Sequence, residues 1–229
     1  MKKQMLVGIT GWKDEHWKSK LAEINRYKIK KIGLFLEMFT PEKRKKVYRA
    51  LLDSEVKEIP LVHLRNEMSL EEIRFLMKNF KTKYFTIHES TFRVIKKWDK
   101  VRRMLYLEMN ADNKIPKGDK VQGIGGFCVD LSHYMMEKTL DSKEYGYIET
   151  KKTILKYFKC NHVNGYSYAN NRDVHTVKNL KEFEYLKKIP KYLFGDVIAI
   201  ETFNSIKDQL IYKKHLVKLL EEEFGLVYA

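Results

Sequence analysis

The chain has 229 residues, enough for one large hydrophobic core, and single α/β barrels commonly contain about 200–250 residues. Hydrophobic residues make up 44% of the sequence, with only 11 Gly and 4 Pro, which excludes a disordered or fibrous chain. The formal net charge of +15 indicates attraction to polyanions such as nucleic acid, although lysines scattered over helix surfaces would give the same value.

No apolar run in the sequence approaches the roughly 18 residues that a membrane span needs, and residues 1–4 lead directly into a strand-like segment. We therefore expect a cytoplasmic protein without membrane association. Cys128 and Cys160 are too few for a disulfide framework, and neither has a paired metal-knuckle spacing. Both thiols are expected to be reduced.

Short runs rich in β-branched and aromatic residues alternate with longer segments of helical period. Eight runs are predicted as strands: 5–9, 31–39, 59–64, 83–88, 103–110, 126–131, 161–166 and 197–202. Between them lie amphipathic segments such as Pro41–Leu52, with Pro in its first turn, and 69–80, which begins with the capping box Ser69-Leu-Glu-Glu72. Parallel strands with crossover helices require this alternation. Eight such units favour a closed (β/α)8 TIM barrel over an open doubly wound sheet, as one α/β domain over residues 1–229.

Histidines and acidic residues cluster at the ends of the predicted strands. The six residues are His63, His88, Glu108, Asp130, His162 and Glu201. His162 lies near the start of its predicted strand, whereas the other five follow apolar runs. All strands of an α/β barrel point in the same direction, so side chains at their C-terminal ends converge on one mouth, where active sites of this architecture are built.

Burying so many ionisable groups together costs several kcal/mol for each unpaired charge, and divalent cations are their natural partners. Imidazole and carboxylate ligands without thiolate suit Zn, Mn or Fe. A bridging carboxylate such as Glu108 can hold two ions about 3.5–4 Å apart. The sequence therefore predicts a metal site that activates water or polarises a bound oxygen.

Two local motifs extend the set of candidate ligands. In Asp130-Leu-Ser-His133 the acid ends a strand and the histidine follows within one turn. Asp173-Val-His175 has the period of an extended segment, which directs both side chains to the same side. Each motif alone is common by chance, but together with the strand ends they make nine candidate ligands.

The remaining histidines and the cysteines have structural interpretations. His16 and His215 lie on predicted helices and are not expected to bind metal. Cys128 and Cys160 each lie two residues before a candidate ligand, so both are expected to pack inside the barrel one layer below the metal site.

In this order the motifs resemble those of the endonuclease IV family of DNA-repair enzymes, within the xylose-isomerase-like barrel superfamily. Gly126-Phe-Cys-Val-Asp-Leu-Ser-His133 is similar to that family's Cys-x-Asp-Thr-Cys-His signature. His162-Val-Asn and Arg172-Asp-Val-His175 resemble its His-x-Asn-Asp and Asp-Arg-His elements, and Ile200-Glu-Thr202 resembles its Leu-Glu-Thr. The resemblance spans nearly the whole chain.

The resemblance implies two or three zinc ions and DNA as the substrate, hydrolysed at a phosphodiester beside an abasic site by metal-activated water. The implied sites are His63, His88 and Glu108; Glu108 with Asp130, His162 and Glu201; and His133, Asp173 and His175. Glu108 and Glu201 are the implied catalytic residues.

Two alternatives stay open at this point. A sugar or sugar-phosphate isomerase or epimerase of the same superfamily would hold a single ion and would use Glu108 and Glu201 as its acid and base. That alternative ranks second because it leaves four candidates without a ligand role: His63, His88, Asp173 and His175. The other alternative is a barrel without catalysis that binds nucleic acid through its basic surface.

Overall fold

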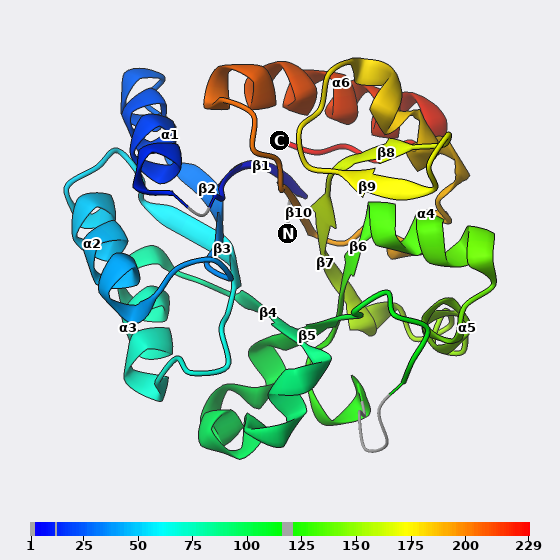
Figure 1. Cartoon of the computed structure of the whole chain (residues 1–229), viewed down its shortest axis with the longest axis horizontal. Coiled ribbons are helices and arrows are strands. Elements are labelled where there is room, and N and C mark those ends of the chain that lie inside the picture. Colours follow the sequence, from blue (N-terminus) through cyan, green and yellow to red (C-terminus); the bar gives the residue numbers. More distant parts are fainter. Residues whose placement is uncertain (1–2, 12, 116–120) are drawn as a thin grey trace.

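The computed structural model describes residues 3–11, 13–115 and 121–229. Eight parallel strands form a closed barrel in the order β1-β10-β7-β6-β5-β4-β3-β2. Their bounds are β1 Gln4–Ile9, β2 Lys31–Phe35, β3 Glu58–His63, β4 Tyr84–His88, β5 Leu105–Glu108, β6 Gly126–Asp130, β7 Phe158–Val163 and β10 Val197–Ile200. In Figure 1 the strands surround the centre of the molecule and the helices lie outside them. The predicted closed α/β barrel is thus confirmed.

The connections between strands differ around the barrel. The α-helices are α1 Asp14–Arg26, α2 Pro41–Leu52, α3 Leu70–Phe80, α4 Leu131–Leu140, α5 Lys143–Glu149 and α6 Ile206–Phe224. Two 3-10 helices, Glu89–Arg93 and Ile95–Met104, connect β4 to β5. Among the described residues, no helix combines the length and the apolar character that crossing a bilayer requires.

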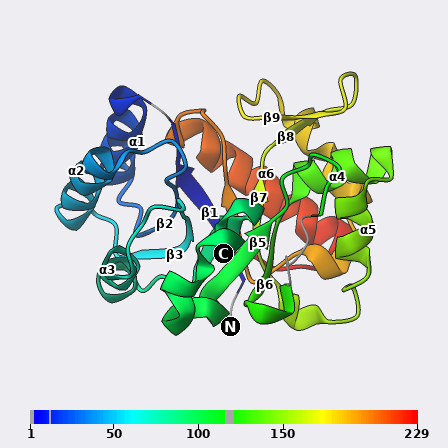
Figure 2. The ribbon, with the colours of Figure 1, turned by 60° about the horizontal axis from the view of Figure 1, so that its bottom comes forward.

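The connection after β7 is irregular. It begins with an antiparallel hairpin, β8 Gly165–Ser167 and β9 Arg172–Val174, and continues as a 3-10 helix, Leu180–Lys188. Figure 2 shows the hairpin projecting from the body of the molecule, away from the N-terminus. Because it follows the C-terminal end of a barrel strand, the hairpin stands at the mouth of the barrel.

Several predicted strand bounds were wrong. The run 31–39 ends as a strand at Phe35, because Leu36 and Phe39 are buried in the following loop and not in the sheet. The run 103–110 contracts to Leu105–Glu108, and 161–166 is replaced by Phe158–Val163. An apolar pattern does not distinguish a strand from a buried loop that covers the barrel end.

Inside the barrel, side chains of alternate residues form one apolar layer. Its members are Leu6, Phe35, Leu61, Tyr84, Tyr106, Cys128, Cys160, Val197 and Ala199. Both cysteines are free thiols in this layer, as predicted. Gly8 leaves room for Phe35, because a Cβ at Gly8 would lie 2.6 Å from the Phe35 ring and 2.3 Å from the carbonyl oxygen of Ile200. The side chains of the intervening strand residues point out of the barrel and pack against the helices.

The predicted capping box at Ser69 is half formed. The hydroxyl of Ser69 accepts the backbone N–H of Glu72 at 3.2 Å. The carboxylate of Glu72 instead accepts hydrogen bonds from Arg44 Nε at 2.6 Å and from the Tyr48 hydroxyl at 2.8 Å. The reciprocal half of the box is absent because the buried guanidinium of Arg44 recruits this carboxylate as its counter-charge.

Replacing Arg44 by Ala is expected to lower the free energy of unfolding by about 3 kcal/mol, since breaking a buried ion pair leaves the partner charges uncompensated. The Arg44 side chain is 2% exposed and donates 2.8 Å hydrogen bonds to Glu67 and to the carbonyl of Phe39. The control is R49A, on the exposed face of the same helix, with an expected change below about 0.5 kcal/mol. Urea denaturation followed by circular dichroism measures both, and equal effects would contradict the expectation.

Candidate metal centre

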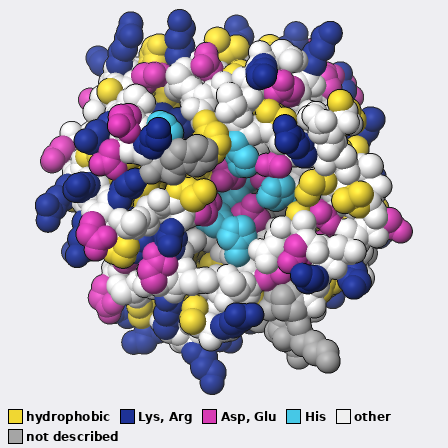
Figure 3. Space-filling view, in the orientation of Figure 1, with side chains coloured by type: hydrophobic (Ala, Val, Ile, Leu, Met, Phe, Trp, Pro, Cys, Tyr) yellow, Lys and Arg dark blue, Asp and Glu magenta, His cyan; other side chains and the backbone are white. Residues whose placement is uncertain are grey.

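The strand ends bring six of the predicted site residues to the mouth of the barrel. His63, His88, Glu108 and Asp130 are the last residues of β3, β4, β5 and β6, and Glu201 directly follows β10. His162 was wrongly predicted near the start of its strand. Because β7 begins at Phe158, His162 is its next-to-last residue. Figure 3 shows histidine and acidic side chains gathered at the centre of this face.

The period of the strands explains this convergence. Except for His88, each of the six residues lies two positions beyond a member of the interior layer, so its side chain also points into the barrel. His88 lies four positions beyond Tyr84, and Thr86 occupies the place between them. The site is therefore the polar layer directly above an apolar one.

Two compact groups of ligand atoms form in this layer. One is His63, His88 and Glu108, and the other is Glu108, Asp130, His162 and Glu201. Within each group, one ligand atom of every residue lies within 4.8 Å of the others. Glu108 belongs to both groups, so the two candidate sites are neighbours that share one carboxylate.

The carboxylate of Glu108 is the centre of the cluster. Its Oε2 lies 3.0 Å from His63 Nε2 and 3.1 Å from His162 Nδ1, and its side chain is 5% exposed. Burial alone would raise the pKa of Glu108, but the imidazoles of His162 and His63 hold it well below the usual range. Glu108 is therefore an ionised acceptor in the interior of the protein.

Each of these two histidines has a further partner that orients its ring. His63 Nδ1 lies 2.9 Å from Glu37 Oε1, and His162 Nε2 lies 3.2 Å from the Thr86 hydroxyl. Such contacts on the distal nitrogen direct the other nitrogen of an imidazole toward a metal. His63 Nε2 and His162 Nδ1 are thus the nitrogens turned toward Glu108.

Glu37 and Thr86 are site residues that the sequence interpretation missed. Thr86 is detectable in principle, because it lies in the inward-facing register of β4 between Tyr84 and His88. Glu37 lies in the loop after β2, two positions beyond Phe35 of the interior layer, so the period-two pattern could have marked it as inward-facing, but only the folded chain brings it to His63.

The residues present fit a divalent cation. Among the described residues, Nδ1 of His88 is buried without a hydrogen-bond partner. Nδ1 of His63 and Nδ1 of His162 form no hydrogen bond of acceptable geometry although they face carboxylates. Orphaned buried nitrogens beside carboxylate oxygens are costly unless a cation joins them. Burial, helped by the neighbouring His63, lowers the pKa of His88, so its imidazole is neutral and has a lone pair to offer.

The carboxylate of Asp130 also accepts hydrogen bonds at the start of α4. Its Oδ1 accepts hydrogen bonds from the backbone N–H groups of Ser132 and His133 at 2.8 and 3.0 Å, and its Oδ2 accepts one from Asn164 Nδ2 at 2.8 Å. The carboxylate is therefore the N-cap of the helix that carries His133. These hydrogen bonds fix the positions of Asp130 and His133 relative to each other.

The third predicted set, His133, Asp173 and His175, lies beside the two groups. Asp173 Oδ2 is 2.8 Å from His175 Nε2 and 3.9 Å from His133 Nε2. Within the described part of the chain these residues do not form a third compact group of ligand atoms. Their role as ligands therefore stays a prediction. His16 and His215 belong to neither of the two compact groups.

A buried lysine supports Glu201 from outside the cluster. Lys20 lies on the inner face of α1 and is 3% exposed, and its Nζ donates to the carbonyl of Thr202 at 2.6 Å. Burial lowers the pKa of Lys20 to about 7. Gln209 donates to the same carbonyl at 3.4 Å. Helices α1 and α6 thus both hold the backbone of Thr202, the residue after Glu201. The sequence signal for a buried polar contact here was a lysine on the apolar stripe of α1.

Comparisons with known proteins leave the family open. No protein-family model and no curated protein matches the chain. A similar solved structure is described as a "putative isomerase from Sinorhizobium meliloti, open loop conformation", with 8% sequence identity and a TM-score of 0.44. The match covers 88% of this chain and 50% of that one, so this chain spans half its length. Fold and site together define an α/β barrel with residues that could hold metal ions at its mouth, whereas membership of the endonuclease IV family stays a prediction.

Metal binding is expected to release protons, so that the apparent affinity for Zn²⁺ rises about tenfold per pH unit for each proton released. Burial alone would lower the pKa of His63 and of His175, but the facing carboxylates of Glu37 and Asp173 raise these values to about 10 and about 9. Both pKa values lie above 7, so both imidazoles are protonated in the metal-free chain and must lose a proton to bind an ion.

Isothermal titration calorimetry in two buffers of different ionisation enthalpy measures the number of protons released. H215Q is the control, because His215 lies on α6 outside the centre and its replacement is expected to leave the release unchanged. An affinity that does not change between about pH 6 and 8 would contradict the prediction.

Proposed function

We propose that the chain is a metal-dependent hydrolase of phosphodiester bonds. The observation that carries this proposal is the sharing of Glu108 between two compact groups of ligand atoms. When bound, two divalent cations bridged by one carboxylate activate water and stabilise the attacking and leaving oxygens of a displacement at phosphorus. A pair of ions therefore favours the hydrolysis of phosphate esters over sugar isomerisation, which would need one ion.

The residues divide into ligands and groups that orient them. His63 and His88 would hold one ion and Asp130, His162 and Glu201 the other, with Glu108 between them. Glu37 and Thr86 fix the rings of the two histidines that contact Glu108. Lys20 fixes the backbone directly after Glu201. These contacts keep the ligand atoms in place before any substrate binds.

The charge of the chain supports a polynucleotide as the substrate. A net charge of +15 favours binding of a polyphosphate backbone through the release of counterions. The motif resemblance points to DNA that contains an abasic site. We therefore propose incision of duplex DNA beside such a site.

The test uses metal-loaded protein and a labelled duplex with one abasic site. We expect incision at that site, its abolition by EDTA, and a loss of at least about 100-fold in E108Q, which removes charge from the shared carboxylate. The intact duplex and bis(4-nitrophenyl) phosphate are the comparison substrates. Hydrolysis of the small diester alone would support a phosphodiesterase but contradict abasic DNA as its substrate.

A second candidate is a sugar or sugar-phosphate isomerase with one ion. The group of Glu108, Asp130, His162 and Glu201 is complete without the other histidines. Burial raises the pKa of Glu201, whereas His162 and His63 hold that of Glu108 well below its usual range. Two nearby carboxyl groups with pKa values shifted in opposite directions are suited to act as acid and base. Deuterium exchange from solvent into an aldose or ketose phosphate would support this candidate.

The number of bound ions separates the two candidates. For the hydrolase we expect two tightly bound ions per wild-type chain, one in H88A, and none in E108Q, because only Glu108 belongs to both groups. H215Q is expected to retain two. Elemental analysis after dialysis measures these values. One ion in the wild type, unchanged in H88A, would overturn the proposal in favour of the isomerase.

A further inference from the structure

A hollow of about 480 Å³ is open to solvent and is lined in part by His175, whose Nδ1 lies 3.1 Å from the carbonyl oxygen of Glu201. Its wall includes Arg172, Asp173, His175, Lys178, Glu182 and Phe203. The hairpin β8–β9 thus provides one side of the hollow, and the loop after β10 provides another. Asp173 and His175 of this wall also belong to the third predicted ligand set.

The carboxylates in this wall already have partners. Asp173 Oδ2 lies 2.8 Å from His175 Nε2. Glu182 Oε2 accepts the backbone N–H of Lys178 at 3.2 Å, and Glu182 Oε1 accepts Asn179 Nδ2 at the same distance. Both acids are therefore engaged by groups of the wall itself.

The two cations in the wall are exposed and lack such partners. In the part of the chain that the structure describes, neither the Arg172 guanidinium nor the Lys178 ammonium forms an ion pair. Figure 3 shows Lys and Arg side chains bordering the central histidine and acid cluster on the side of the hairpin. Because Asp173 pairs with His175, the two cations outnumber the remaining acid, Glu182, and the net charge of the wall is positive.

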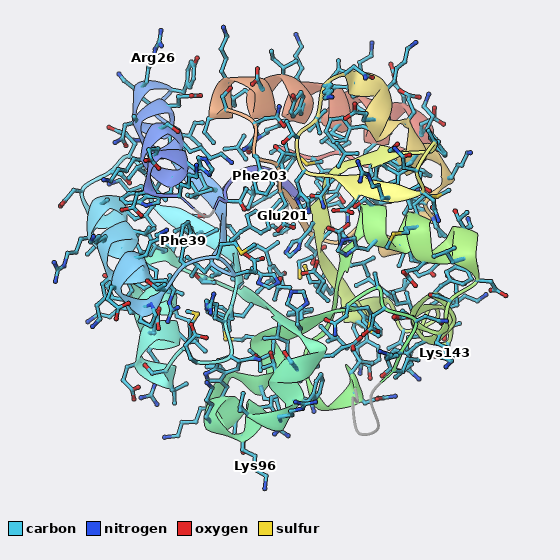
Figure 4. All side chains as sticks on the ribbon, in the orientation of Figure 1. Arg26, Phe39, Lys96, Lys143, Glu201 and Phe203 are labelled. Atoms are coloured by element: carbon cyan, nitrogen blue, oxygen red, sulfur yellow. The ribbon has the colours of Figure 1, made fainter. Side chains whose placement is uncertain are left out.

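The wall also includes the aromatic ring of Phe203. The ring of Phe203 stacks on that of His175, with centroids 5.3 Å apart and planes 29° apart. The Phe203 backbone N–H donates to the carbonyl of His175 at 2.7 Å, which ties the two loops together. Figure 4 shows Phe203 close to Glu201 at the barrel mouth. A ligand in the hollow would thus have both cations and an aromatic ring within its lining, next to the candidate metal centre.

We propose that this hollow binds a second phosphate group of the substrate, held by Arg172 and Lys178, while the reacting group lies at the metal centre. Guanidinium and ammonium groups are the usual protein ligands of phosphate. The inference deepens the proposed function and rests on it for the position of the reacting group. The phosphate is either the neighbouring one of a polynucleotide or the terminal one of a phosphorylated sugar.

The test compares two double variants of the full chain with equal change in charge. R172A/K178A removes both cations of the hollow. K96A/K143A removes two exposed lysines at the periphery, as Figure 4 shows, and controls for net charge. Fluorescence anisotropy with a labelled single-stranded oligonucleotide measures affinity in EDTA, where hydrolysis plays no part. Ribose 5-phosphate and unphosphorylated ribose serve as competitors.

We expect R172A/K178A to weaken oligonucleotide binding about tenfold more than the control variant and to reduce the slope of log affinity against log salt by one to two. If ribose 5-phosphate competes with the wild type and not with R172A/K178A, the hollow accepts a phosphorylated sugar. If only oligonucleotide binding changes, the phosphate belongs to a polynucleotide.

Failure of this inference and failure of the proposed function have different signatures. If no phosphodiester is cleaved but R172A/K178A still weakens phosphate binding more than K96A/K143A, the hollow is a phosphate site and the hydrolase proposal fails. If the two double variants bind both ligands equally well, the inference is overturned, whatever the activity of the chain. Thermal melting of both variants checks that they are folded.

Discussion

The buried carboxylate of Glu108 is the constraint on which the arrangement of the site depends. An ionised carboxylate in the interior is stable only where positive charge or strong donors surround it. The imidazoles of His63 and His162 approach it from β3 and β7, at 3.0 and 3.1 Å. Closure of the barrel brings these strands to opposite sides of the same mouth. The charged cluster therefore depends on closure of the barrel.

The layer beneath the cluster determines how strong these interactions are. Cys128, Cys160 and Phe35 fill the interior directly below the ligand atoms, and the edge of the Phe35 ring meets His162 at a centroid distance of 4.9 Å. An apolar floor excludes water and lowers the local dielectric, which strengthens every charge interaction above it. The same burial raises the pKa of the Cys128 thiol, so this sulfur is a packing group.

The irregular parts of the barrel carry the features that would distinguish one substrate from another. Helices α1 to α3 cover the first strands regularly, whereas the connection after β7 is a hairpin that supplies Asp173 and Arg172 and forms a wall of the hollow. Barrels of this type diversify through the loops at the C-terminal ends of their strands. In the proposed function, the candidate metal centre would set the kind of reaction, and the hairpin would contribute to the choice of substrate.

The sequence by itself determined the barrel, helix Pro41–Leu52 and the strand ends that carry histidine and acid, because periodicity and strand termini are local signals. Only the tertiary structure decided that Glu37 orients His63, that Lys20 supports the backbone 182 residues away after Glu201, and that the third ligand set is looser than the other two. These are contacts between segments distant in sequence. They exist only after the barrel has closed, and although local patterns can mark Glu37 and Lys20 as inward-facing, no local pattern identifies their partners.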